Sequence, residues 1–272
     1  MAYKLLVVDL DGTLVGKAGV IREDDIQSLE RVRKAGITLA LSTGRMPQAC
    51  RDFFSKLPLN GLHIFYDGAL VAGYPNNGSL LNQGLEKDLA RDMVLQARRQ
   101  EIYLELYTSR GYFTEQNTQA ARIHAKLLGI APEIRDLLEL LKDREEIIKG
   151  GSIASSDRER KDLDDFEKHF KGKLRLAWAS APDFPTLDFV NMVHPLVSKG
   201  KALEVLALHL GIAPDEIVAI GDGENDIPLL TTAGLGIAMG NASEKVKKAA
   251  RAVTLRQEEG GVAFAIKTFL GI

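Results

Sequence analysis

The chain has 272 residues, of which 45% are hydrophobic and 26% are charged. This ordinary composition excludes a disordered tail protein, and the length suits one large domain or two smaller ones. The 35 basic residues nearly balance the 37 acidic residues, for a formal net charge of −2. A duplex-binding protein more often carries a basic excess, so nucleic acid is not the favoured partner.

The thiol content and the apolar runs bear on the cellular compartment. The single cysteine, Cys50, cannot form an internal disulfide, and one thiol cannot build the usual structural zinc site. We expect Cys50 to be a small packing residue in a reducing, cytoplasmic setting. The apolar run Leu5–Val8 is too short for a signal-peptide core, and no run approaches the ~20 apolar residues of a membrane helix. The sequence therefore predicts no association with a membrane.

Strand and helix patterns alternate from the N-terminus. The apolar run LLVV ends at Asp9 and has the pattern of a buried strand. Residues 23–36 predict a helix, with acids in its first turn and Gly36 as its stop. ITLALS and LHIFY predict two more strands, with a helix from Pro47 to about Leu57 between them. This β-α-β-α-β order predicts a parallel sheet with helices on both faces.

The same alternation returns near the C-terminus. Lys199–Leu210 predicts a helix that stops at Gly211, and IVAIGDG predicts a strand that enters a glycine-rich turn. Five further elements are predicted in chain order: the short helix NDIPLLTTAG, the strand LGIAMG, a helix near Ser243–Ala250, the strand AVT and the helix GVAFAIKTFL.

The middle of the chain has a different pattern. YLELYT and GYFT predict a hairpin, and helices are predicted at Glu86–Gln100, Thr118–Leu128, Ile134–Leu141 and Arg158–Phe170. Three more strands are predicted there: IIKGGSIAS, LRLAWAS and TLDFV. Strand pairs with helices indicate an α+β insert in an α/β protein. We expect residues 1–82 and 188–272 to form one domain and residues 83–187 to form the insert.

Polar clusters follow three of the predicted strands. Asp9 and Asp11 follow the first strand, Ser42–Arg45 follows the second, and the sequence GDGEND (221–226) follows a late one. Ligands of open parallel sheets bind outside the carboxyl ends of the strands. Residues far apart in sequence are therefore expected to meet in one crevice.

This crevice would hold an excess of acid. Asp9, Asp11, Asp222 and Asp226 would repel one another unless a cation compensates them. Oxygen ligands beside a phosphate suit Mg²⁺. Thr43 and the turn amides near Gly12 and Gly44 are donors suited to phosphate oxygens. Lys199 is the first residue of a predicted helix, where the helix dipole does not favour a cation. An anion bound in front of that helix would explain why a lysine stands there.

Each motif also has a purely structural interpretation. DLDGT alone could be a turn, Thr43–Arg45 a turn with a helix cap, and Lys199 a solvated surface lysine. GDGEND alone could be a calcium loop, but it lacks the glutamate that an EF-hand has six residues past its glycine. All of them together, in this order and at strand ends, favour an active site.

DLDGTL, STGR, SKGKAL and GDGENDIPLL together resemble the four motifs of the haloacid-dehalogenase superfamily, along nearly the whole chain. The insert and the tail IAMGNASEKVKKAARAVTL resemble its Cof-like type IIB branch of sugar-phosphate and phosphoglycolate-type phosphatases. The resemblance implies a Rossmann-like core in which the insert is a cap. It also implies that Asp9 is the nucleophile that becomes an aspartyl phosphate, and that Asp11 is the general acid and base.

The remaining roles are implied in the same way. Thr43, Gly44, Lys199 and Asn225 would hold the phosphoryl group or orient the substrate. The residues that would bind Mg²⁺ are Asp9, Asp11, Asp222 and Asp226. Such roles suit phosphoryl transfer, which needs positioning and charge neutralisation.

Two regions give less direct information. Many Cof-like proteins have Asn-Gly-Ala after the third strand, whereas this chain has Asp67 there, to which we assign no catalytic role. Leaving-group specificity is expected from the cap, with Arg110 and Tyr112 as candidate contacts, although aromatic residues on strands more often pack in hairpins. None of the five histidines has metal-ligand spacing, so all are interpreted as structural or surface residues.

We therefore predict a cytoplasmic, Mg²⁺-dependent phosphatase of small phosphomonoesters, as a monomer or homodimer. The first alternative is a phosphomutase or phosphotransferase that uses the same aspartyl phosphate. The second is a receiver-like signalling module, which does not explain the insert or GDGEND. The third is a phosphosugar-binding protein, which should have lost Asp9 or Asp11, whereas both are present.

Overall fold

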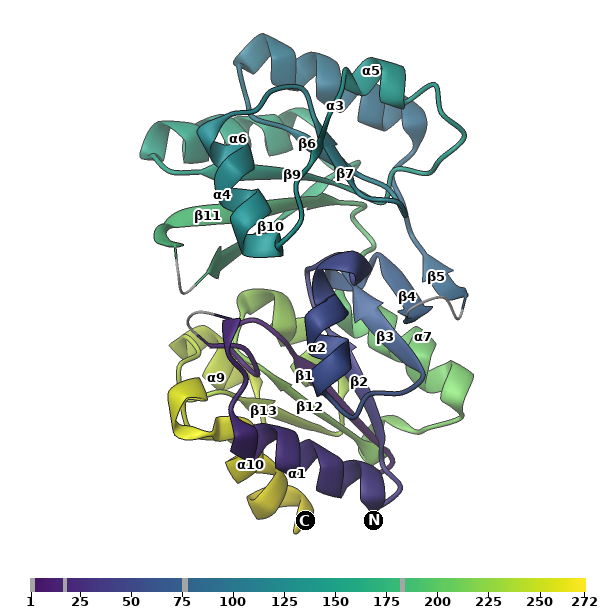
Figure 1. The fold of residues 1–272 in the computed structure, drawn as a ribbon, viewed down its shortest axis with the longest axis vertical. Helices are drawn as coiled ribbons and strands as arrows, with labels where there is room; N and C mark the ends of the chain where they lie inside the picture. Colours follow the sequence, from purple (N-terminus) through teal and green to yellow (C-terminus); the bar gives the residue numbers. More distant parts are fainter. Residues whose placement is uncertain (1–2, 17–18, 75–77, 182–183) are drawn as a thin grey trace. The chain divides into compact units, whose positions relative to one another are not determined.

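The computed structural model describes residues 3–16, 19–74, 78–181 and 184–272, which form two compact units (Figure 1). The first unit comprises Met1–Leu81 and Ser198–Ile272, and the second comprises Asn82–Val197. The chain thus leaves the first unit once and returns to it. The second unit extends to Val197, beyond the predicted boundary at 187, because its long strand β11 (Phe184–Val193) stays paired with its neighbours as far as Val193.

An eight-stranded sheet forms the centre of the first unit, in the order β14-β13-β12-β1-β2-β3-β4-β5. Its strands are β1 (Leu5–Asp9), β2 (Thr38–Ser42), β3 (Leu62–Phe65), β4 (Leu70–Gly73), β5 (Ser79–Asn82), β12 (Ile217–Gly221), β13 (Leu235–Ala238) and β14 (Ala252–Val253). Every residue of β1 is buried, as suits a central strand covered on both faces. The α/β class is confirmed, and the five strands from β14 to β2, with β3, run parallel. Strand β4 pairs antiparallel with β3 and was not predicted.

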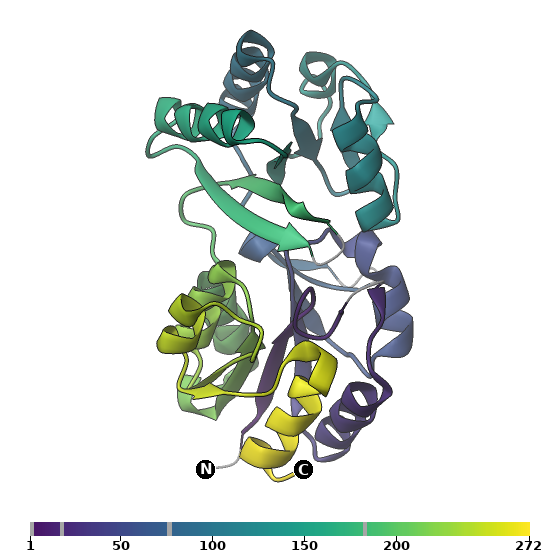
Figure 2. The same cartoon turned by 90° about the vertical axis from the view of Figure 1, so that its left-hand side faces the viewer.

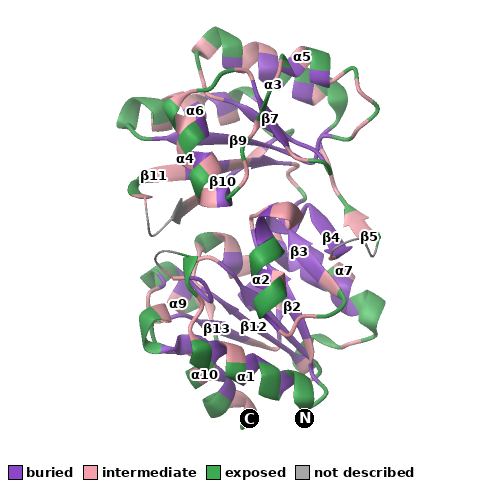
Figure 3. Cartoon of the chain, in the orientation of Figure 1, coloured by how far each residue is buried: buried purple, intermediate pink, exposed green. Residues whose placement is uncertain are grey.

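Helices cover both faces of this sheet (Figure 2). The helices are α1 (Glu23–Lys34), α2 (Arg51–Lys56), α7 (Lys199–Leu210), α8 (Ile227–Thr232), α9 (Glu244–Ala249) and α10 (Gly261–Ala265). Side chains alternate along a strand, so Leu5 and Val7 of β1 pack with α7 and α8, while Leu6 and Val8 point to the other face. Figure 3 shows the central strands of this sheet as buried and the outer helix faces as exposed. Cys50 is fully buried, as expected of a packing residue.

The second unit is built on a six-stranded sheet, in the order β10-β11-β9-β6-β7-β8. Its strands are β6 (Glu105–Tyr107), β7 (Tyr112–Thr114), β8 (Glu133–Ile134), β9 (Lys149–Ala154), β10 (Arg175–Ala181) and β11, and its helices are α3 (Lys87–Gln100), α4 (Gln119–Leu128), α5 (Leu137–Leu140) and α6 (Asp157–His169). The predicted hairpin is confirmed as β6 and β7. The helix predicted from Ile134 was wrong at its start, because the Asp136 side chain caps the amides of Leu138 and Glu139 and begins the helix there.

One large apolar cluster joins α3 and α6 to this second sheet, and it includes Met93, Leu106, Phe166 and Val190. Trp178 packs against it, in line with the packing role expected of a strand aromatic. A smaller cluster places Ile123 and Leu127 of α4 against Ile153 and Phe189. Among the described residues, no helix is long and apolar enough to cross a membrane.

Candidate active site

The carboxyl ends of three neighbouring strands carry polar residues of the site. Asp9 is the last residue of β1, Thr43 directly follows β2, and Asp222 directly follows β12. Asp9 stands beside Ser42 in the parallel register, and Val8 stands beside Ile220. The strands therefore end at one edge of the sheet, as an open parallel sheet requires of a binding site.

Lys199 lies at the centre of this edge. It is the first residue of α7 and only 1% exposed. Its Nζ donates to Asp9 Oδ1 at 2.5 Å, to Asp226 Oδ1 at 2.6 Å and to the Ser42 carbonyl oxygen at 3.4 Å. Burial would lower the pKa of Lys199, but the neighbouring carboxylates of Asp226 and Asp9 outweigh it and raise the pKa. The lysine is thus a buried cation.

The acids around this cation outnumber it. Burial raises the pKa of Asp9 well above its ordinary value, Asp226 adds to the rise, and Lys199 opposes it. Burial and the charge of Asp226 also raise the pKa of Asp222, to about 7. One ammonium therefore does not balance the carboxylates of the site, and its negative charge remains in excess.

The loop after β12 is folded around Asp226. Its Oδ2 accepts hydrogen bonds from the backbone amides of Asp222, at 3.0 Å, and Gly223, at 2.9 Å. Its Oδ1 accepts from Lys199. Asp226 is 1% exposed, and its two oxygens thereby fix both the loop and the lysine.

The acid set fits a hard divalent cation. Asp9, Asp222 and Asp226 each offer a carboxylate oxygen, and these oxygens lie within 4.8 Å of one another. Asp222 is oriented by two donors, Thr13 Oγ1 at 2.9 Å and Asn241 Nδ2 at 3.2 Å. Asp222 packs directly against Gly12, where only glycine fits, because a Cβ at position 12 would lie 2.3 Å from Asp222 Oδ2.

Asp11 is held by an arginine of the next loop. Arg45 Nε donates to Asp11 Oδ2 at 2.7 Å, and Arg45 Nη2 donates to Asp11 Oδ1 at 2.6 Å. This bidentate pair fixes the plane of the carboxylate. The guanidinium also lies 5.3 Å from the centre of the Phe53 ring. Arg45 belongs to the motif STGR, but the sequence predicts no role for it, since sequence spacing does not show which acid it faces.

The predicted phosphate donors lie in the same region of the first unit. Thr43 is 1% exposed, and its Oγ1 accepts a hydrogen bond from the Arg45 amide at 3.1 Å. Gly44 connects these two residues in the loop after β2. The Nδ2 of Asn225 donates to Asp67 Oδ1 at 2.8 Å. Asp67 therefore joins the site through Asn225, a contact that was not predicted.

The two residues proposed for leaving-group specificity make contacts inside the second unit. Tyr112 is 2% exposed, stacks on Tyr107 with ring centres 5.1 Å apart, and donates its hydroxyl to the Ile130 carbonyl at 2.8 Å. Arg110, in the hairpin turn, is exposed and pairs with Glu145 and Asp143.

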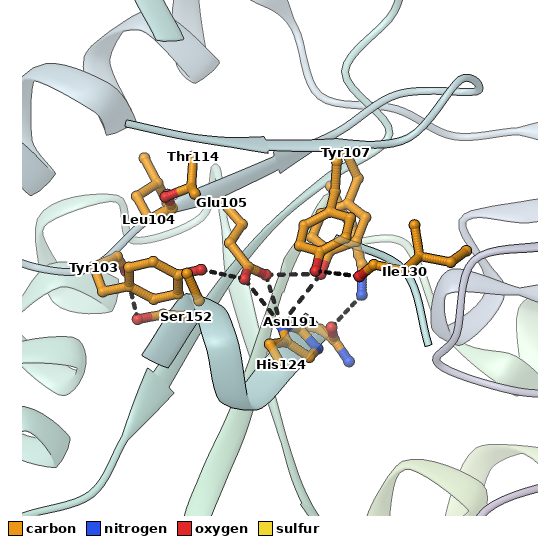
Figure 4. A network of polar contacts seen from close by, with 12 residues as sticks. Tyr103, Leu104, Glu105, Tyr107, Thr114, His124, Ile130, Ser152 and Asn191 are labelled. Carbon is orange, nitrogen blue, oxygen red and sulfur yellow. Dashed lines mark hydrogen bonds and ion pairs between the residues drawn. The ribbon is translucent and has the colours of Figure 1, made fainter. Parts of the chain in front are cut away.

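The second unit contains a buried polar network that the sequence does not predict (Figure 4). Glu105 is fully buried and accepts hydrogen bonds from the hydroxyls of Tyr103 and Tyr107, the latter at 2.7 Å. His124 Nδ1 of α4 lies 2.8 Å from Glu105 Oε2. Burial would raise the pKa of Glu105, but the charge of His124 and these hydrogen bonds hold it below its ordinary value. His124 thus lies in a buried network with an acid of its own unit.

Comparison with known proteins connects this geometry to a family. The model of the haloacid dehalogenase-like hydrolases matches residues 6–266. The phosphatase YwpJ of Bacillus subtilis is 30% identical over 98% of this chain and 100% of its own length. A phosphoglycolate phosphatase of Methanopyrus kandleri is 29% identical, over 98% of this chain and 97% of its own.

Solved structures give the same result for the fold. A haloacid dehalogenase-like hydrolase from Bacteroides thetaiotaomicron is 29% identical and has a TM-score of 0.84, covering 97% of this chain and 98% of its own. A sugar phosphatase of subclass IIB, 23% identical, has a TM-score of 0.84 over 99% of this chain and 100% of its own, which shows likeness of fold alone. Both units of the chain are thus present in the solved relatives.

Proposed function

The chain belongs to the haloacid dehalogenase-like hydrolases and is a phosphatase of small phosphoesters. From that premise we propose that it hydrolyses phosphomonoesters through an aspartyl phosphate on Asp9. The observation that carries this proposal is the contact of Lys199 with both Asp9 and Asp226 at the end of β1. A buried cation beside a carboxylate can hold a phosphoryl group that the carboxylate attacks.

The reaction has two steps. In the first, a carboxylate oxygen of Asp9 forms a bond to phosphorus while the bond from phosphorus to the leaving alkoxide breaks, and Asp11 gives its proton to that alkoxide. In the second, Asp11 takes a proton from water, whose oxygen bonds to phosphorus as the bond to Asp9 breaks. Orthophosphate is released, and both aspartates return to their initial states. The bidentate pair with Arg45 holds Asp11 in its ionised form, which is the form that takes the proton from water in the second step.

The family implies a divalent metal ion, and we propose Mg²⁺ held by Asp9, Asp222, Asp226 and the main chain at Asp11. Such an ion supplies positive charge that offsets repulsion between the Asp9 carboxylate and the phosphate dianion. Thr13 and Asn241 orient Asp222 for this role. Thr43, Gly44 and Asn225 are proposed to donate to phosphate or substrate oxygens.

We propose sugar phosphates or phosphoglycolate-like acids as the substrates. Two relatives support this class: the phosphoglycolate phosphatase, and a 5-amino-6-(5-phospho-D-ribitylamino)uracil phosphatase of Bacillus subtilis that is 27% identical over 97% of this chain and 94% of its own. Core residues that hold the phosphoryl group cannot distinguish one alcohol from another. The second unit is therefore proposed to supply leaving-group specificity, with Arg110 and Tyr112 as first candidates.

A screen of phosphate release over a panel of phosphomonoesters, with Mg²⁺ present, tests the activity. We expect turnover of several small substrates and none by Asp9→Asn. Analysis of the products tests the alternative reaction, since a phosphomutase or phosphotransferase would pass the group to another hydroxyl and release little orthophosphate.

A matrix of kcat/KM values tests the origin of specificity. Arg110→Ala and Tyr112→Phe are expected to change the ranking of substrates by kcat/KM. For a substrate that loses a polar contact, transition-state stabilisation should fall by about 1–3 kcal/mol. Lys199→Ala is expected to depress all substrates together. Equal scaling of every substrate by the Arg110 and Tyr112 variants would show that these two residues do not select the leaving group.

A further inference from the structure

The backbone is strained directly after β3. Tyr66, Asp67 and Gly68 follow one another with φ values of +52°, +56° and +103°. Residues with a side chain seldom adopt such values, and they persist only where the surroundings hold them, which is common at functional sites. Aspartate tolerates this region better than most residues. The contacts of this turn must therefore stabilise the strained conformation.

Backbone contacts hold the turn against two loops of the active site. The Tyr66 amide donates to the Arg45 carbonyl at 3.2 Å, and the Asp67 amide donates to the Thr43 carbonyl at 3.1 Å. On its other side, Gly68 lies so close to the chain before α7 that a Cβ would be 2.3 Å from the Ser198 carbonyl oxygen. Asp67 is thus placed between the loop of Thr43 and the start of the helix that begins with Lys199.

The side chain of Asp67 acts on two further residues of the site. It is 1% exposed, and its Oδ1 accepts the hydrogen bond from Asn225 Nδ2 at 2.8 Å. Its carboxylate adds to the rise in the pKa of Lys199 that Asp226 and Asp9 cause. An asparagine at position 67 could accept the same hydrogen bond but would lack the charge.

We propose that Asp67 is a positioning residue with two separable effects: its carboxylate oxygen orients Asn225, and its negative charge weakens the binding of the phosphate dianion. This inference rests on the proposed function. Because Asp67 is buried beside Lys199, its repulsion of a bound dianion is poorly screened by solvent. Orthophosphate, the product, is then released more readily than it would be from a site with asparagine at this position.

The charge effect is tested with Asp67→Asn. Binding of orthophosphate to the Mg²⁺-loaded protein is measured by isothermal titration calorimetry, without turnover. We expect Asp67→Asn to bind orthophosphate on the order of tenfold more tightly than the wild type. Asp67→Asn should keep a higher single-turnover rate than Asp67→Gly, because asparagine can still accept the hydrogen bond from Asn225. Equal or weaker orthophosphate binding by this variant overturns the charge effect.

The positioning effect is tested with Asp67→Gly, which removes the side chain and still allows the positive φ. Asp67→Gly and Asn225→Ala should each lower the single-turnover rate, and the double variant should lower it no further, since both remove one interaction. Independent, multiplying losses would overturn this effect. Thermal unfolding of each variant verifies that it is folded, and Asp67→Asn provides the conservative rescue.

Phosphate release and orthophosphate binding by the wild type distinguish failure of this inference from failure of the proposed function. A wild type that neither releases nor binds orthophosphate would contradict the proposed phosphatase. A wild type that does both, alongside an Asp67→Asn protein with unchanged orthophosphate affinity, would contradict only the charge effect of Asp67.

Discussion

The two units bury charge in opposite ways. In the first unit, Lys199 contacts Asp9 and Asp226, while burial raises the pKa of Asp9 and Asp222, so the carboxylates there are not compensated by the protein alone. In the second unit, the carboxylate of Glu105 is surrounded by donors, and its pKa is held low. Buried polar groups that satisfy one another stabilise a fold, whereas an unbalanced cluster needs a ligand.

The largest effect that this comparison predicts is on Asp9. Asp9→Asn keeps the shape of the side chain and removes the nucleophilic charge, so phosphate release should fall by at least about 10³-fold. The fold should be retained, because the variant relieves the excess of negative charge. Phosphate release and a thermal melt of the purified variant are the two measurements. Near-normal release would contradict the covalent mechanism.

Removal of the metal ion should have the next largest effect. If the acids of the first unit need a cation, exhaustive chelation should lower activity by at least about 100-fold, and Mg²⁺ should restore it. Ca²⁺ should inhibit, because its larger and looser coordination misplaces the phosphate relative to Asp9. Steady-state rates against metal concentration measure both effects, and full activity after chelation would contradict the metal site. Asp222→Ala should reduce activity more than Asp67→Ala.

For the second unit the comparison predicts a loss of stability. Glu105→Gln leaves buried donors of Tyr103, Tyr107 and His124 without an anion, so the free energy of unfolding should fall by about 2–4 kcal/mol. Urea unfolding at pH 7 measures it, with the exposed Glu139→Gln of the same unit as a control expected to change little.

The pH dependence of Glu105 follows from the sign of its shift. The pKa of Glu105 is lower in the folded protein than its ordinary value of 4.5, so the folded state binds this proton less readily. Its stabilising contribution is therefore present above pH 4.5 and is lost as the pH falls below it. The difference between wild type and Glu105→Gln should shrink at acidic pH, and a difference that grows there would contradict the ion pair.

The smallest predicted effect concerns a buried carboxylate of the first unit outside the site. Asp25 of α1 accepts from the Ala263 amide at 2.8 Å, and its Oδ2 has no hydrogen-bond partner among the described residues. Burial raises its pKa from 3.8 to about 6. The folded state thus binds this proton more tightly than the unfolded state, and stability is lost as the pH rises between these values.

Asp25→Asn removes that loss. The variant should match the wild type near pH 4 and exceed its free energy of unfolding by on the order of 2 kcal/mol at pH 8. Thermal or urea unfolding across this range measures the difference. Asp24→Asn, exposed in the same helical turn, is the matched control for the helix dipole. A gain that does not depend on pH would point to another cause.

The sequence alone was sufficient for the strands and helices with strong periodicity and for the acids at strand ends. It predicted β1 from the apolar run before Asp9, and the hairpin of β6 and β7 from alternation. It did not predict β4, whose apolar residues follow the Asp67 turn within a few positions and lack a pattern of their own. A strand as short as β4 depends on pairing with its neighbours, which local propensity does not encode.

The sequence did not predict which side chains far apart in the chain contact each other in the site. Asn225 and Asp67 meet across 158 positions, and Arg45 meets Asp11 across 34. Residue types suggest that such groups are polar and near the site, but only the fold determines which atoms face each other. The burial of Glu105 was not predictable from the sequence either, since an acid on a short strand usually faces solvent.

The close approach of backbone to carboxylates in the first unit also has a consequence for mutational tolerance. A Cβ at Gly12 would meet Asp222 at 2.3 Å, and a Cβ at Gly221 would meet Asp226 at 2.6 Å. Even alanine must therefore displace an acid of the site. A saturation mutagenesis library selected for activity should reject every substitution at these two glycines, although neither has a side chain that could act in the chemistry. By contrast, Gly111, with no atom near its missing Cβ, should accept most residues.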